Sequence, residues 1–312
     1  MSSPPLGSLS ADLEDEWVYR RGLGDPGWAD RSSYLGVLAH RLETVLEGRQ
    51  ATCFAVGADA ERAEWAELLR SLHDRGHEIA NHSYEHDLRL HRRPPAEIER
   101  DLARAADAIA EATGERPGGF RSPGYGSSRQ LRAVLARQGY RYDASRLPSP
   151  SGPLARAWFG RHYPPRRLRA RDVFEGVAEL AAGVRPHRVR VEGRELVELP
   201  VTVMPYTRLP IHPSQLLLLA RSSSRLALRY LELALGLCAR HGIGPAVVIH
   251  PTDLLDGADA PALRGFPAMD VPAARKLDLV RKWLSVAEAR FALGTLAAQA
   301  AAVPTTPRAR TS

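Results

Sequence analysis

The stretch from Leu35 to Val56, LGVLAHRLETVLEGRQATCFAV, predicts a helix followed by a buried strand. Leu38, Leu42 and Val45 recur at the three- and four-residue spacing of one helix face. The apolar run from Ala51 to Val56 is short and continuous, which favours a strand that is buried on both sides.

The rest of the chain repeats this alternation of short apolar runs and helical patterns. The expected strands are 8–13, 51–56, 78–80, 196–203 and 246–249, and the expected helices are 35–46, 65–72, 95–112, 128–138, 213–238 and 273–289. Such alternation predicts parallel strands joined by helices, with reactive groups gathered at the C-terminal strand ends.

The expected organisation is a single folded domain with short flexible ends. We expect a flexible N-terminus over residues 1–7, one domain over 8–298 and a disordered tail over 299–312. The Pro-, Gly- and Ser-rich segment 147–165 is expected to be an irregular excursion inside that domain.

Composition excludes several classes of protein. The chain has 312 residues, of which 44% are hydrophobic, enough for a sizeable core. Its net charge is +7, but the arginines are interleaved with Asp and Glu and lack interspersed aromatic residues, so no nucleic-acid partner is expected. Cys53 and Cys238 form no disulfide or metal pattern. Without a leader peptide or an apolar run of about 18 residues, a cytoplasmic protein with no transmembrane segment is expected; the sequence makes no prediction of oligomeric state.

Two histidines, His82 and His86, follow the apolar run that ends at Ala80. On a helical turn this spacing would project both rings from one face, where they can bind one divalent cation through nitrogen. A carboxylate would complete a His/His/acid triad with open positions for water and substrate. Histidine pairs at this spacing are also common as surface or capping residues, so the metal interpretation depends on an acid from elsewhere in the chain.

An acidic run follows the first expected strand and contains Asp12, Glu14, Asp15 and Glu16. Asp12 and Glu14 are two residues apart, so on a strand both point to the same side. One of them could hold the metal while the other accepts a proton. In isolation the run would be interpreted as an exposed acidic loop.

Polar residues also follow two later strand ends. Arg121 begins a Gly- and Pro-rich turn, where it is expected to orient Asp12 and hold it ionised. The same turn could aim the backbone N–H of Tyr125 at a developing oxyanion. His250 directly follows the apolar run 246–249, a position that suits a general acid. A solvated arginine and a core histidine are the alternative interpretations.

Together these clusters resemble the polysaccharide deacetylase family, also called carbohydrate esterase family four, over roughly residues 9–296. The Pro-rich segment 209–213 and the segment 290–296 are similar to the branch associated with bacterial exopolysaccharide systems. The motifs that carry the resemblance are His82-Ser83-Tyr84-Glu85-His86, Arg121-Ser122-Pro123, Tyr142-Asp143-Ala144-Ser145, Glu198-Leu199-Pro200 and Ile249-His250-Pro251.

The resemblance implies a distorted (β/α)7 barrel and a metal-dependent hydrolysis of an N-acetylated sugar or glycan. In it, a water on the metal is deprotonated by Asp12 and attacks the acetamide carbonyl, and His250 protonates the leaving amine. The implied metal ligands are His82, His86 and an acid of the first motif. Zinc is the expected ion, and cobalt, nickel, iron and manganese are also compatible with such ligands.

The chain departs from the family pattern in two ways. The usual first motif ends in two adjacent aspartates, whereas here Asp12 and Glu14 are separated by Leu13. We assign the metal to Glu14, because an acid, a spacer and an acid also occur in the family, and keep Asp15 as the reserve ligand. The longer Glu leaves metal preference and rate open. The second departure is the lack of an export signal, which favours a soluble or lipid-linked sugar precursor as substrate.

Two other functions fit the same scaffold. One is an amidase acting on a non-polymeric amide, such as a cyclic ureide or a natural-product intermediate. The other is a catalytically inactive carbohydrate-binding module. The presence of His82, His86, Asp12 and His250 together argues against the inactive module, which has no chemical need for this set.

Overall fold

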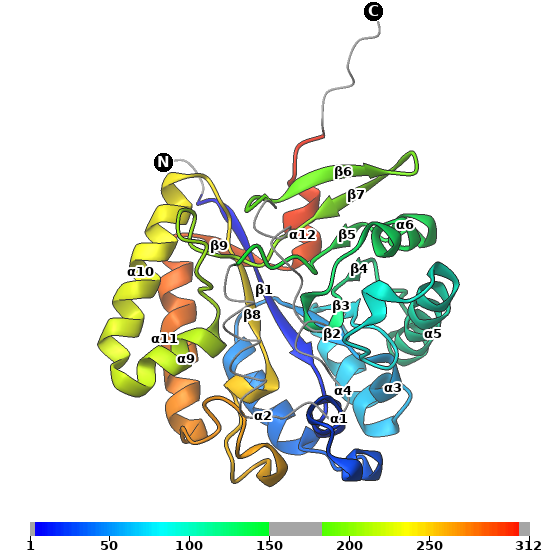
Figure 1. Ribbon diagram of the computed structural model, residues 1–312. Coiled ribbons are helices and arrows are strands. Elements are labelled where there is room, and N and C mark those ends of the chain that lie inside the picture. Colours follow the sequence, from blue (N-terminus) through cyan, green and yellow to red (C-terminus); the bar gives the residue numbers. More distant parts are fainter. Residues whose placement is uncertain (1–3, 150–182, 306–312) are drawn as a thin grey trace, which may run out of the picture.

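A curled nine-stranded sheet forms the centre of the computed structural model, counted over residues 4–149 and 183–305, which are those that the structure describes (Figure 1). The strand order is β6-β7-β5-β4-β3-β2-β1-β8, and β9 also pairs with β1. All pairings are parallel except the β6–β7 hairpin. The strands are β1 (Leu6–Leu13), β2 (Thr52–Ala55), β3 (Glu78–Asn81), β4 (Gly119–Phe120), β5 (Tyr142–Asp143), β6 (His187–Val191), β7 (Arg194–Glu198), β8 (Ala246–Ile249) and β9 (Ala292–Gly294).

In the described ranges, helices lie between most successive strands and cover the outside of the sheet (Figure 1). The α-helices of the described ranges are α1 (Glu16–Leu23), α2 (Leu35–Leu46), α3 (Gly57–Ala60), α4 (Ala63–Asp74), α5 (Pro95–Thr113), α6 (Arg129–Gln138), α9 (Pro213–Ser222), α10 (Ser224–Arg240), α11 (Ala273–Glu288) and α12 (Leu296–Ala301). The predicted single-domain barrel is confirmed as a curled half-barrel, whose sheet path ends at β6 and β8.

The leucines and valine that predicted the α2 helix are buried. Leu38, Leu42 and Val45 are each at most 1% exposed and belong to the main core between the helices and the sheet. Strand β2 is buried along its whole length, as its apolar sequence predicts.

Strand β1 lies between β2 and β8 in the sheet and is buried along seven of its eight residues. It pairs with β2 on one side and β8 on the other, and its first residues pair with β9. Side chains that leave the C-terminal end of β1 therefore meet those of the neighbouring strands.

Several boundaries differ from the sequence prediction. The expected helix 213–238 is two helices, because the Ser223 side chain caps the start of α10 by accepting a hydrogen bond from the Leu226 N–H at 3.2 Å. The expected strand 196–203 begins at Arg194 and ends at Glu198, where it pairs with β6. The segment 147–165 lies largely outside the described residues.

Ordered structure continues past the expected start of the C-terminal tail. Helix α12 extends to Ala301, and Gln299 is 4% exposed. Its side chain accepts a hydrogen bond from Ser8 Oγ at 2.7 Å and donates one to the Gly244 carbonyl at 3.0 Å. Likewise β1 begins at Leu6, inside the expected flexible N-terminus.

None of the described helices is both long enough and apolar enough to cross a membrane.

Candidate active site

The register of the sheet brings the predicted site residues to one edge. Ala11 of β1 pairs with Ile249 of β8, so the residues that follow them, Asp12 and His250, are neighbours. In the same way Asn81 of β3 pairs with Phe120 of β4. The next residues, His82 and Arg121, therefore also lie side by side at the C-terminal strand ends.

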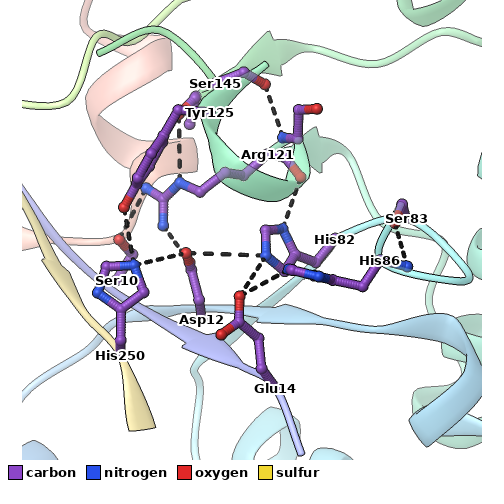
Figure 2. A network of polar contacts seen from close by, with 12 residues as sticks. Ser10, Asp12, Glu14, His82, Ser83, His86, Arg121, Tyr125, Ser145 and His250 are labelled. Atoms are coloured by element: carbon purple, nitrogen blue, oxygen red, sulfur yellow. Dashed lines mark hydrogen bonds and ion pairs between the residues drawn. The ribbon is translucent and has the colours of Figure 1, made fainter. Parts of the chain in front are cut away.

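Glu14, His82 and His86 form a cluster of three cation-binding side chains (Figure 2). Glu14 Oε1 is 3.2 Å from His82 Nε2 and 2.9 Å from His86 Nε2. The three ligand atoms all lie within 4.8 Å of one another, and among the described residues no other group of three meets this criterion. Two imidazoles and one carboxylate are a ligand set that suits zinc and other divalent transition metals.

The segment that carries the two histidines is a bent loop, so the expected helical turn is wrong. Ser83 and His86 have φ values of 67° and 51°, in the left-handed region. Side-chain hydrogen bonds hold this loop: Asn81 Oδ1 accepts from the Ser83 N–H at 2.8 Å, and Ser83 Oγ accepts from the His86 N–H at 3.0 Å. Such backbone strain is characteristic of functional loops, and here it turns both rings toward Glu14.

The surroundings of the cluster favour the neutral histidine rings and the ionised carboxylate that bind a cation. His82 Nδ1 lies 2.8 Å from the Arg121 carbonyl oxygen, so an Nδ1–H donates there and Nε2 is left to face the cluster. Burial lowers the pKa of His86 and outweighs the opposing charge of Glu14, which favours the neutral ring. Burial would raise the pKa of Glu14, but His86 and His82 hold it well below its usual range, so Glu14 is a carboxylate.

Asp12 is held between the cluster and His250 by a fully buried arginine. Arg121 Nη1 donates to Asp12 Oδ1 at 2.5 Å, and its Nη2 donates to Ser10 Oγ at 3.0 Å. The guanidinium carbon also lies 4.1 Å from the centre of the Phe54 ring. The predicted pairing of Arg121 with Asp12 is therefore present, with the guanidinium oriented by contacts on several sides.

The second oxygen of Asp12 faces two histidines. Asp12 Oδ2 is 4.0 Å from His82 Nε2 and 3.5 Å from His250 Nε2 (Figure 2). Asp12 itself is 2% exposed, so its carboxylate projects from the end of β1 into the shared space between these rings.

His250 is surrounded by acceptors that favour its charged form. Its Nδ1 lies 3.6 Å from Asp253 Oδ2 and 3.3 Å from Ser214 Oγ, and its backbone N–H donates to Asp253 Oδ2 at 2.8 Å. Burial alone would lower the pKa of His250, but the contact with Asp253 and the charge of Asp12 raise it to about 9. His250 is therefore protonated at neutral pH, as a general acid requires.

Tyr125 reaches the site by its side chain rather than by its backbone. Its hydroxyl lies 3.0 Å from His250 Nε2, whereas its backbone N–H donates to the Ser122 carbonyl at 3.0 Å within the turn. The expected role of this N–H as an oxyanion donor does not agree with that hydrogen bond. The left-handed φ of 61° at Tyr125 turns the ring toward His250.

Asp15, the reserve metal ligand, has its oxygens bound elsewhere. Its Oδ1 accepts from the Glu16 N–H at 2.8 Å and caps helix α1. Its Oδ2 accepts from Arg62 Nη1 at 2.6 Å and from Trp65 Nε1 at 3.0 Å. This geometry favours Glu14 over Asp15 as the acidic ligand.

Asp253 and Ser214 are site residues that the sequence reasoning missed. The sequence contained a signal for Asp253. Pro251 directly follows His250 and can begin a helical turn, and an acid at the third position of that turn, here Asp253, can cap it. Ser214 lies at the start of α9, 36 positions before His250, so its contact depends on tertiary packing alone.

Comparisons with known proteins agree with this architecture. Residues 44–142 match the family model described as polysaccharide deacetylase, and this range contains His82, His86 and Arg121. No curated protein matched the chain.

Solved structures share the fold over nearly the whole chain. A Mycobacterium smegmatis protein described as a polysaccharide deacetylase is 22% identical, covers 98% of each chain and has a TM-score of 0.57. A Pseudomonas aeruginosa PAO1 protein of the same description is 16% identical, covering 94% of this chain and 89% of its own, with a TM-score of 0.55. The Puue allantoinase is 16% identical, covering 96% of this chain and 91% of its own, with a TM-score of 0.56.

The match over residues 44–142 includes both histidines of the cluster, and the shared fold extends the likeness to the remaining strands. Residues 44–142 are therefore similar to the polysaccharide deacetylase family, and the assignment of the chain to an exopolysaccharide branch stays a prediction.

Proposed function

We propose that this protein is a metal-dependent hydrolase that removes N-acetyl groups from an amino sugar or a glycan. The observation that carries the proposal is the position of Asp12. Its carboxylate is paired with Arg121 on one oxygen, and its other oxygen lies 3.5 Å from the His250 ring and 4.0 Å from His82 of the cation-binding cluster. A base, an acid and a metal site thus surround one small space.

Glu14, His82 and His86 would hold the metal ion, and zinc fits their donor atoms. When bound, such an ion lowers the pKa of a water molecule and polarises a carbonyl oxygen. The Arg121 carbonyl fixes the His82 ring through Nδ1, which keeps its Nε2 directed at the ion.

Asp12 acts as the general base in this proposal. It accepts a proton from the attacking water while the water oxygen forms a bond to the acetamide carbon. The Arg121 guanidinium is buried and hydrogen-bonded to Ser10 and the Ala144 carbonyl, and its contact with Asp12 fixes the orientation of that carboxylate before the reaction.

His250 acts as the general acid. Its Nε2–H protonates the amine nitrogen as the C–N bond breaks, so that acetate and a free amino sugar leave. The pKa of about 9 for His250 means that the proton is available at neutral pH. Asp12 Oδ2 and His250 Nε2 are 3.5 Å apart. The proton that Asp12 takes from water can therefore pass to His250, which restores the initial protonation states of both residues.

The amino-sugar substrate is supported by the family description. An amidase that acts on another amide would use the same base, acid and ion, and the allantoinase with this fold makes a cyclic ureide the relevant competitor. The two functions differ in the substrate that fits above Asp12, so substrates must be compared directly. A cytoplasmic location stays a prediction.

The experiment is a hydrolysis assay on N-acetylated mono- and oligosaccharides, with allantoin and simple N-acyl amides as parallel arms. We expect acetate release that a chelator abolishes and that zinc, cobalt, nickel, iron or manganese restores to different degrees. Asp12→Asn should keep its bound metal but lose about 10²- to 10⁴-fold in kcat, because the proton acceptor is gone while the ligands remain. Chelator-resistant acetate release, or full activity of Asp12→Asn, would refute the proposed mechanism.

Turnover of the ureide or the simple amide without the acetylated sugars would instead establish the amidase. Absence of turnover in every arm, with metal bound in full, would favour the inactive carbohydrate-binding module.

A further inference from the structure

The outward-facing side of helix α10 combines arginines with exposed leucines. At about 100° per residue, Arg225, Arg229, Arg240, Leu226 and Leu233 fall within an arc of about 100° around the helix axis. Leu226 and Leu233 are 52% and 59% exposed, and the three arginines are exposed as well. We call these five residues the α10 outer face.

The positive charge of the α10 outer face is not neutralised by neighbouring carboxylates. Within residues 4–149 and 183–305, no carboxylate lies within 4.0 Å of Arg225, Arg229 or Arg240, whereas Arg221 on α9 pairs with Asp270 at 2.8 Å. Within α10 itself, Glu232 is the one acid, so the helix carries three arginines and one carboxylate. In Figure 1, α10 lies at the left margin, on the outside of α9 and α11.

The mixture of charged and apolar side chains favours one class of partner. A nucleic acid or another polyanion would use the arginines and leave the two leucines in water. The surface of a bilayer with anionic lipids offers phosphates to the arginines and an apolar boundary to the leucines, so it uses both. We propose that the α10 outer face binds the surface of an anionic lipid bilayer.

Helix α10 is connected in the chain to an element of the candidate active site. Helix α9 joins α10 directly, and Ser214 in the first turn of α9 contacts His250 at 3.3 Å.

The test measures binding of the full chain to vesicles by co-sedimentation, without reference to activity. Vesicles of phosphatidylglycerol and phosphatidylcholine should bind the protein at least about tenfold more tightly than phosphatidylcholine alone, and added salt should weaken the binding. Arg225→Gln, Arg229→Gln and Arg240→Gln together should weaken it roughly a hundredfold, at about fivefold per arginine. Leu226→Ser with Leu233→Ser should weaken it roughly tenfold or more, because apolar burial is lost.

The matched control removes three exposed arginines elsewhere: Arg100 on α5, Arg129 on α6 and Arg141 before β5. The triple change to Gln at these positions should leave vesicle binding as in the wild type. Equal weakening by this control, no preference for anionic vesicles, or unchanged binding of the leucine variant would each overturn the proposal. Acetate release from a soluble substrate, measured on the same α10 variants, should equal that of the wild type, which separates this result from a failure of the proposed function.

Discussion

At the scale of single residues, the protonation of His250 depends mainly on Asp253. The Asp253 carboxylate is 1% exposed and accepts the His250 backbone N–H at 2.8 Å while lying 3.6 Å from Nδ1. Because burial by itself lowers the pKa of His250, its pKa of about 9 exists only while this carboxylate and Asp12 are charged.

Asp253→Asn should therefore shift the alkaline limb of activity toward lower pH. In the wild type, the acid form of His250 is lost as the pH rises through about 9, so kcat/KM should fall there. Removal of the Asp253 charge lowers the pKa of His250, and we expect the limb to move down by at least about one pH unit. The measurement is a pH profile of kcat/KM, with Asp270→Asn, an exposed acid paired with Arg221, as the control. If the alkaline fall in kcat/KM stays at the same pH in Asp253→Asn, Asp253 does not raise the pKa of His250.

Glu14 and Asp15 are adjacent acids with different expected roles. Glu14→Gln should lose bound metal and activity together, because its carboxylate joins the two histidines. Asp15→Asn should retain metal but lower the free energy of unfolding by about 1–3 kcal/mol, because Asp15 accepts from Arg62 and Trp65 inside the protein. Metal content and urea unfolding are measured on both variants. If Asp15→Asn loses metal and Glu14→Gln does not, Asp15 rather than Glu14 is the acidic metal ligand.

The residue types of the site could be predicted, but some of their geometry could not. Spacing and strand ends were sufficient to group His82, His86, Arg121 and His250, since parallel strands bring such positions together. The left-handed backbone at Ser83 has no clear sequence signal, because most residues with positive φ in other proteins are Gly or Asn. For this reason a helical turn was expected where a bent loop occurs.

At the scale of elements, the break between α9 and α10 depends on one capping serine. Ser223→Ala should lower the free energy of unfolding by about 0.5–2 kcal/mol, because the Leu226 N–H loses its acceptor at the start of α10. The adjacent exposed Ser222, which is not the cap, provides the control Ser222→Ala. Urea unfolding of both variants is the measurement, and equal stability of the two would contradict the capping role.

Elements with strong periodicity were predicted well, and those set by tertiary pairing were not. The helix 35–46 and the strand 246–249 have the same bounds in the structure as in the sequence prediction. Strand β6 and the three-residue strand β9 escaped prediction, because short strands with exposed residues lack the apolar run that marks a buried strand. The break at Ser223 was missed because apolar periodicity continues on both sides of it.

At the scale of the whole molecule, the proposed metal joins segments that lie far apart in the chain. Glu14 follows β1 and His82 follows β3, so a bound ion would link two strands of the folded sheet that the unfolded chain does not hold together. Zinc at about 100 times its Kd should stabilise the fold by about 2.7 kcal/mol relative to chelator-treated protein. His82→Ala should abolish this increment in urea unfolding, and an unchanged increment would place the ion elsewhere.

The pairing of β1 also determines when this strand can fold during synthesis. Both β8 and β9 lie more than 230 residues after β1, yet they pair with it directly, and Gln299 bonds to Ser8. During translation, β1 therefore lacks these two partners until more than 230 further residues have been synthesised. Contacts between such distant segments slow folding. A nascent chain that already contains Asp12 cannot carry out the proposed chemistry until the segment with His250 has been made and has paired with β1.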